Sequence, residues 1–243
     1  FTKIFFEKLK SDHFNAYPET EVLYKKLSQH HNINIDKIIV TAGSDAAIRN
    51  CFDLFVSPGD KIITLNPTFA MVDVYSKIFN AKQIKINYDK NLKINIDEIL
   101  NNIDNSLTLI IIANPNSPTG TIIPIEDMQK IISKANICKA AVLVDEAYFG
   151  FCKETTLPLL SNFSNLIISR TFSKSYGIAG LRVGYLLTNQ TLAKLLYAIK
   201  PMYEVNSLGL LSAIILLDNP NINSQYISDV KVGKELLINF LVK

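Results

Sequence analysis

Cysteine and histidine are scarce in this chain of 243 residues, and tryptophan does not occur. The cysteines are Cys51, Cys138 and Cys152, and the histidines are His13, His30 and His31. Neither set has the Cys-x-x-Cys or His-x-x-x-His spacing of a metal site, so we expect no bound metal. An odd number of widely spaced cysteines argues against a disulfide framework and favours a reducing compartment, so the expected location is the cytoplasm.

An excess of one charge and a long apolar run are also missing. The chain has 25 basic and 22 acidic residues, spread along its length, and no basic stripe that would indicate a nucleic-acid partner. The longest apolar run, 208–217, is interrupted by Ser212 and is far shorter than the ~20 residues of a membrane span. Residues 1–10 mix lysine and glutamate with aromatics, unlike a signal peptide. These absences leave a small molecule as the expected partner.

Apolar runs that alternate with amphipathic segments indicate an α/β protein. Strands are predicted at 37–40, 61–65, 82–86, 108–113, 140–144, 166–168 and 183–187, and apolar runs such as 108–113 are typical of parallel strands buried on both faces. Helices are expected at 1–14, 21–31, 46–55, 71–79, 95–103, 125–135, 190–199 and 208–217, followed by a polar turn at 218–223 and a helical tail from 225. Asn95 is expected to cap the helix that it begins. We therefore predict a mostly parallel sheet with helices on both faces.

One lysine stands out because of the residues around it. Lys174 follows Ser169, Thr171 and Ser173, and glycines and Arg182 come after it, between two predicted buried strands. An amine among hydroxyl groups, with a guanidinium nearby, suits covalent bonding to a carbonyl compound whose phosphate is held alongside. The alternative is an ordinary loop lysine between strands, with glycines for the turns.

Three other segments place polar groups beside the ends of predicted strands. Gly43-Ser44-Asp45 lies between a strand and a helix, where free amides form either an anion cradle or an ordinary helix cap. The loop 114–120 contains two prolines and a glycine at the carboxyl end of a strand, where open α/β sheets place ligands. Asp145 ends a buried strand, so its carboxylate needs a cationic partner.

The segment Ser169-x-Thr171-x-Ser173-Lys174, followed by Gly177, Gly180, Arg182 and Gly184-Tyr185, resembles the lysine signature of class I/II, fold-type-I pyridoxal-phosphate aminotransferases. Within that family the chain is most similar to the histidinol-phosphate aminotransferase branch, from about Tyr17 to Asn206. The resemblance implies the fold-type-I architecture and pyridoxal 5'-phosphate as cofactor. It also implies an arm at 1–20, a large coenzyme-binding domain at 21–220, and a helix at 221–243 that leads to a small carboxyl-terminal domain largely absent from this sequence.

The resemblance assigns a role to each matching residue. Lys174 carries the coenzyme and moves the proton, Asp145 pairs with the ring nitrogen, and Tyr148 bonds the ring oxygen together with Asn116 or Ser117. The family asparagine expected directly before Pro118 is Ser117 here, so the sequence leaves the choice between Asn116 and Ser117 open. Phe69 is expected to stack on the ring. The phosphate is expected to contact Gly43, Ser44, Asp45, Thr171, Ser173 and Arg182, with Tyr17 added from the second subunit of a homodimer.

The expected reaction is transfer of an amino group between an amino acid, phosphorylated or not, and a 2-oxo acid. Relatives of the histidinol-phosphate branch carry asparagine at the position of Glu204, and an acidic residue there would repel a phosphorylated substrate. Two alternatives remain. One is a phospho-amino-acid decarboxylase of the phosphoserine or phosphothreonine type, which shares the same lysine, aspartate and arginine. The other is a truncated fragment that binds the coenzyme without turnover, because the arginine that holds the substrate carboxylate lies in the missing domain.

Overall fold

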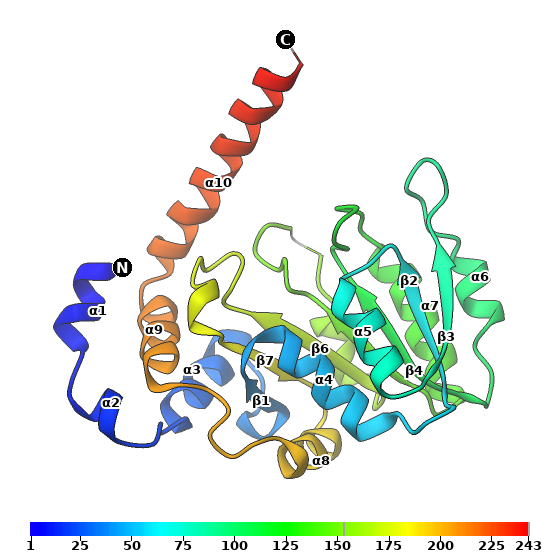
Figure 1. The fold of residues 1–243 in the computed structure, drawn as a ribbon, viewed down its shortest axis with the longest axis horizontal. Coiled ribbons are helices and arrows are strands. Elements are labelled where there is room, and N and C mark those ends of the chain that lie inside the picture. Colours follow the sequence, from blue (N-terminus) through cyan, green and yellow to red (C-terminus); the bar gives the residue numbers. More distant parts are fainter. Residues whose placement is uncertain (153, 243) are drawn as a thin grey trace.

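A central sheet of seven strands organises the chain in the computed structural model, which describes residues 1–152 and 154–242 (Figure 1). The strands are β1 (Ile38–Thr41), β2 (Lys61–Asn66), β3 (Lys82–Asn87), β4 (Leu107–Ala113), β5 (Ala141–Asp145), β6 (Leu166–Thr171) and β7 (Gly184–Leu187). Their order across the sheet is β1-β7-β6-β5-β4-β2-β3. Strand β7 pairs antiparallel with both β1 and β6, and the other described strand pairs are parallel, so the expected mostly parallel sheet is confirmed.

Helices cover both faces of this sheet. Those of the described chain are α1 (Thr2–Lys8), α2 (Asp12–Asn15), α3 (Glu21–His31), α4 (Gly43–Phe55), α5 (Ala70–Ile78), α6 (Ile96–Asn101), α7 (Ile125–Ile137), α8 (Gln190–Ile199), α9 (Ser207–Asp218) and α10 (Pro220–Leu241). One apolar core packs α4, α5 and α8 on one face, and the other packs α3, α6, α7 and α9 on the opposite face. The central strands are therefore buried on both sides, as their unbroken apolar runs require.

Short polar signals fix several helix starts. The side chains of Asn95, Asn189 and Asn206 accept hydrogen bonds from backbone amides at the beginnings of α6, α8 and α9, so the predicted asparagine cap at 95 is confirmed. At the other end of a helix, α3 stops after His31 because Asn32 adopts a left-handed conformation with φ of 52°.

Four details differ from the sequence predictions. The expected helix at 1–14 is two short helices, α1 and α2, interrupted at residues 9–11. Helix α4 begins at Gly43, so the presumed loop before it forms its first turn. Strand β6 continues to Thr171, three residues beyond the predicted end. The polar turn expected at 218–223 is only Asn219, because proline tolerates the first turn of a helix and α10 starts at Pro220.

Helix α10 has no buried residue and extends away from the sheet, while the amino-terminal helices lie beside α9 (Figure 1). None of the described helices is both long and apolar enough to cross a membrane. The boundaries of the arm, the large domain and the tail helix stay predictions.

Candidate active site

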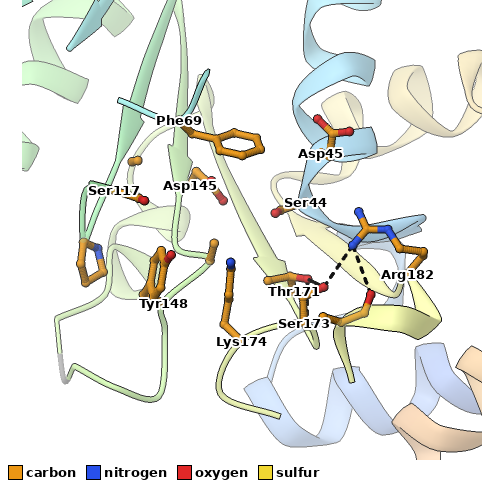
Figure 2. A pocket seen from close by; sticks show the side chains of 14 residues that line it. Ser44, Asp45, Phe69, Ser117, Asp145, Tyr148, Thr171, Ser173, Lys174 and Arg182 are labelled. Atoms are coloured by element: carbon orange, nitrogen blue, oxygen red, sulfur yellow. Dashed lines mark hydrogen bonds between the residues drawn. The ribbon is translucent and has the colours of Figure 1, made fainter. Parts of the chain in front are cut away.

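A cavity of about 310 Å³ lies where β4, β5 and β6 end and α4 begins (Figure 2). The carboxyl ends of parallel strands meet at one edge of the sheet, which is why segments distant in sequence converge there. Ten of the thirteen predicted site residues line this cavity: Ser44, Asp45, Phe69, Ser117, Asp145, Tyr148, Thr171, Ser173, Lys174 and Arg182. The structure therefore brings the predicted amine, acid and guanidinium together.

Asp145 is the buried acid of the cavity, with 5% of its surface exposed. It ends β5 directly beside Ser169 of β6, and the Ser169 hydroxyl donates a hydrogen bond to its Oδ1. Burial raises the pKa of Asp145 to about 6, and the Ser169 hydrogen bond acts against that rise. A carboxylate held in this way gains from any cation that enters the cavity, because the cation offsets the cost of removing the charge from water.

Lys174 supplies the amine. It lies in the loop after β6, and Figure 2 shows its side chain directed into the cavity beside Tyr148. Its Nζ is 5.3 Å from the centre of the Tyr148 ring, within the distance for a cation–π contact. The amine therefore reaches the same space that Asp145 borders.

A cluster of hydrogen-bond donors occupies the other end of the cavity. The Ser173 amide donates to Thr171 Oγ1 at 3.1 Å, and Arg182 Nη1 donates to Ser173 Oγ at 3.4 Å (Figure 2). Ser44 lies in the first turn of α4, where unpaired amides and the helix dipole favour an anion. Two hydroxyls, a guanidinium and a helix start suit a phosphate group.

Two glycines allow this cluster to form. Gly43 has φ of 82°, and a Cβ there would lie 2.7 Å from Arg182 Nη2, so the guanidinium packs directly on its backbone. A Cβ on Gly184 would lie 2.5 Å from the Gly43 carbonyl carbon, so β7 can approach α4 only without a side chain at that position.

The walls of the cavity are aromatic and polar. Phe69 precedes α5, and Figure 2 shows its ring across the cavity from Tyr148 and Lys174. Asp45 accepts a hydrogen bond of 3.0 Å from the Tyr75 hydroxyl, and burial, together with that bond, raises the pKa of Tyr75 to about 12. A flat ring that enters the cavity would therefore meet an aromatic face on one side.

Asn116 does not line the cavity. Its amide nitrogen donates to Pro67 O at 3.0 Å and to Thr119 Oγ1 at 2.7 Å, and its oxygen accepts from Thr68 at 2.9 Å. These bonds join the two loops that follow β2 and β4 and leave the buried amide occupied. Ser117 is the residue of this pair that borders the cavity.

Tyr17 and Glu204 also lie away from it. Tyr17 is 73% exposed and stacks on Tyr203, with 4.1 Å between ring centres. The Oε1 of Glu204 accepts a hydrogen bond of 3.0 Å from the Ala42 amide at the start of α4, and Glu204 is not among the cavity-lining residues. Its expected repulsion of a substrate phosphate stays a prediction.

Sequence reasoning gave no role to Ser169, which bonds Asp145, or to Tyr75, which bonds Asp45. The strand register carries the signal for Ser169, because it is the direct partner of Asp145 across β5 and β6. Tyr75 could not be found this way, since its contact depends on how α5 packs against α4.

A buried acid, an aromatic wall and a cluster of donors suit a planar, phosphorylated ring with a cationic nitrogen. Residues 6–233 match the model of the family "Aminotransferase class I and II", and the chain belongs to this family. A histidinol-phosphate aminotransferase from Caldanaerobacter subterraneus is 40% identical over 83% of this chain and 57% of its own length. One from Thermoanaerobacter pseudethanolicus is 36% identical over 98% of this chain and 67% of its own.

A solved structure shares the fold. Histidinol-phosphate aminotransferase from Sinorhizobium meliloti, in complex with pyridoxal-5'-phosphate, superposes with a TM-score of 0.87 at 21% identity and covers 96% of this chain and 64% of that one. This similarity confirms the predicted fold-type-I architecture. The chain spans about three fifths of the length of the curated relatives it matches.

Proposed function

We propose that this chain is the pyridoxal-phosphate-binding part of an aminotransferase. The observation that carries the proposal is the convergence of Lys174, Asp145 and Arg182 on one cavity. The residues fit the coenzyme: a buried acid for the ring nitrogen, an aromatic face for the ring, and a hydroxyl and guanidinium cluster for the phosphate. The cavity volume is at the lower end of the range for small-molecule sites.

When bound, the coenzyme supplies an electron sink for the bonds at the substrate Cα. In this proposal Asp145 holds the ring nitrogen in its protonated form, and Phe69 fixes the plane of the ring. Arg182, Thr171, Ser173, Asp45 and the start of α4 at Gly43 and Ser44 bind the phosphate end. Tyr148 and Ser117 bind the ring oxygen, with Asn116 holding the Ser117 loop in place.

Lys174 has two tasks in the proposed reaction. Its Nζ is the amine that reaches the cavity, so it is the group that would hold the coenzyme covalently at rest. Once released by the substrate amine, the same Nζ would act as the general base and acid that moves the proton of the substrate Cα.

The proposed substrates are an amino donor of the histidinol-phosphate type and a 2-oxo acid acceptor. The two curated relatives are aminotransferases, which favours amino-group transfer over decarboxylation of a phospho-amino acid. The same relatives favour a catalytic protein over a remnant that only binds coenzyme.

We further propose a homodimer in the cytoplasm, in which Tyr17 reaches the phosphate end of a second copy's cavity. Tyr17 is largely exposed and does not line the cavity of its own chain. The arm at 1–20 also exposes Phe6 and Phe14, which a second copy would cover. The cytoplasm is supported by three free thiols, of which Cys51 is fully buried.

Product analysis tests the reaction. Purified protein is supplied with pyridoxal phosphate, histidinol phosphate and 2-oxoglutarate. A parallel reaction contains phosphothreonine in place of histidinol phosphate as the control substrate. Glutamate and carbon dioxide are measured in both. Transamination predicts glutamate that depends on both substrates, and Lys174→Ala should abolish it. Release of carbon dioxide from phosphothreonine without glutamate would assign the decarboxylase instead.

A further inference from the structure

A buried ion pair lies directly behind the candidate active site. Glu146 follows Asp145, and Arg170 lies between Ser169 and Thr171, yet each side chain of the pair is only 1% exposed. Arg170 Nε and Nη2 both donate to Glu146 Oε2, at 3.0 and 2.8 Å. The proposed mechanism uses neither residue.

Every polar atom of the Glu146 carboxylate is engaged. Its Oε1 accepts hydrogen bonds from the Thr156 amide at 2.6 Å and the Thr156 hydroxyl at 2.9 Å, and Thr155 donates to Oε2 at 2.9 Å. The carboxylate therefore has one orientation, fixed from the strand end on one side and from the loop at 155–156 on the other.

Arg170 is fixed as firmly. Its guanidinium lies 3.5 Å from the centre of the Phe149 ring, its Nη2 donates to Thr155 at 2.7 Å, and its Nη1 is 3.2 Å from Nδ1 of His31. His31 Nε2 in turn is 2.9 Å from the Tyr185 hydroxyl. Burial, and then the charge of Arg170, lower the pKa of His31 to about 2, so this imidazole is neutral and adds no charge to the network.

The pair joins the two strand ends that carry the site. Side chains alternate along β6, so Ser169, which bonds Asp145, and the cavity-lining Thr171 lie on one face of the sheet while Arg170 lies on the other. The Glu146 amide also donates to the Ser169 carbonyl at 2.9 Å. The Glu146–Arg170 pair therefore adds a side-chain link between the strand end that carries Asp145 and the strand end that carries Thr171.

We propose that Glu146 and Arg170 are positioning residues that hold the ring-binding acid and the phosphate-binding hydroxyl of the coenzyme site at their working separation. Stability alone does not explain the pair, because apolar side chains of similar volume commonly replace a buried ion pair without loss of stability. A bonded pair, however, admits only one alignment of β5 and β6. The inference rests on the proposed function, since it assigns coenzyme contacts to Asp145 and Thr171.

The test compares coenzyme affinity in two variants with two controls. Arg170→Lys keeps the charge and loses the planar fork, and Glu146→Gln keeps the shape and loses the charge. Asp53→Asn removes a charge from the exposed pair with Arg49, and Ile131→Ala weakens the core away from the cavity. The apoprotein is titrated with pyridoxal phosphate across pH, well below the unfolding temperature of each variant, which is measured separately.

Arg170→Lys and Glu146→Gln should each raise the Kd for pyridoxal phosphate about tenfold, whereas Asp53→Asn and Ile131→Ala should leave it within twofold.

The pH dependence of binding gives a second readout. The groups around Asp145 are Ser169, Lys174, Cys51 of α4 and Glu146, and the charge of Glu146 raises the pKa of Asp145. Removing the Glu146 charge should therefore move the pH midpoint of binding downward, which loss of packing in Ile131→Ala would not do.

Wild-type affinity in folded Arg170→Lys, or an unchanged pH midpoint in Glu146→Gln, overturns the inference. If Glu146→Gln does not fold, Arg170→Lys decides the outcome by its Kd alone. Failure of the wild-type protein to bind pyridoxal phosphate at all would refute the proposed function instead.

Discussion

Replacing Asp145 by asparagine should make the coenzyme-free protein more stable above pH 6. The carboxylate is buried with 5% of its surface exposed, and burial raises its pKa from 3.8 to about 6. At about 1.36 kcal/mol per pKa unit, keeping the charged form in the folded state costs about 3 kcal/mol. Asparagine removes that cost and keeps an oxygen that can accept the Ser169 hydrogen bond.

The sign of the pH dependence follows from linkage. Below pH 3.8 the acid is protonated in both the folded and unfolded states, and its burial then has no ionic cost. As the pH rises to about 6 the unfolded state loses its proton first, so the folded state loses stability, and above pH 6 the full cost remains. The stability advantage of Asp145→Asn should therefore be absent well below pH 3.8, grow towards pH 6 and stay constant above it.

Urea unfolding of both proteins without coenzyme, followed by far-ultraviolet circular dichroism between pH 4.5 and 8, measures this difference. Other carboxylates contribute equally to both proteins and cancel. At pH 8 we expect the free energy of unfolding of Asp145→Asn to exceed that of the wild type by about 1–3 kcal/mol. Coenzyme at one hundred times the wild-type Kd should raise the free energy of unfolding of the wild type alone by about 2.7 kcal/mol. A variant that is no more stable than the wild type at pH 8 would refute the argument that Asp145 is held for a cationic partner.

Three further variants, one of them with a matched control, test separate parts of the site. Arg182→Ala removes the guanidinium of the phosphate cluster and should raise the Kd for pyridoxal phosphate about 10- to 100-fold, measured by titration, because a hydrogen bond to a charged group contributes about 1.5–3 kcal/mol. Gly184→Ala would place a Cβ 2.5 Å from the Gly43 carbonyl carbon and should lower the melting temperature by several degrees, while Gly180→Ala, with open space around it, should not. Ser169→Ala removes a bond that lowers the pKa of Asp145, so the pH midpoint of coenzyme binding should move upward, and no movement would show that this bond does not tune the acid.

Much of the fold could be predicted because each structural signal was local. The unbroken apolar run at 108–113 predicts a central strand, and β4 occupies 107–113. The asparagine at 95 predicts a helix start, and its side chain caps α6. The starts of α4 and α10 were misplaced because Gly43 and Pro220 are tolerated in the first turn of a helix, which sequence patterns alone do not resolve.

The site was predictable as far as its residues belong to contiguous motifs. Lys174 and Arg182 lie within one segment, and Asp145 follows its own strand. The choice between Asn116 and Ser117 depended on which side chain the neighbouring loop engages, and only the contacts with Pro67 and Thr68 settle which one borders the cavity. The partners of the Glu146–Arg170 pair come from the loop at 155–156, which bonds Glu146, and from His31 of α3, which contacts Arg170, so no spacing could reveal them.

Mapping the covalent attachment of the coenzyme tests the central claim most directly. The protein is incubated with pyridoxal phosphate, reduced with borohydride, digested and examined by mass spectrometry, with Lys174→Ala as the matched control. The account predicts one phosphopyridoxyl group per chain, on the peptide that contains Lys174, and its loss in the control. Label spread over exposed lysines, or an unlabelled Lys174 in folded protein, would contradict it.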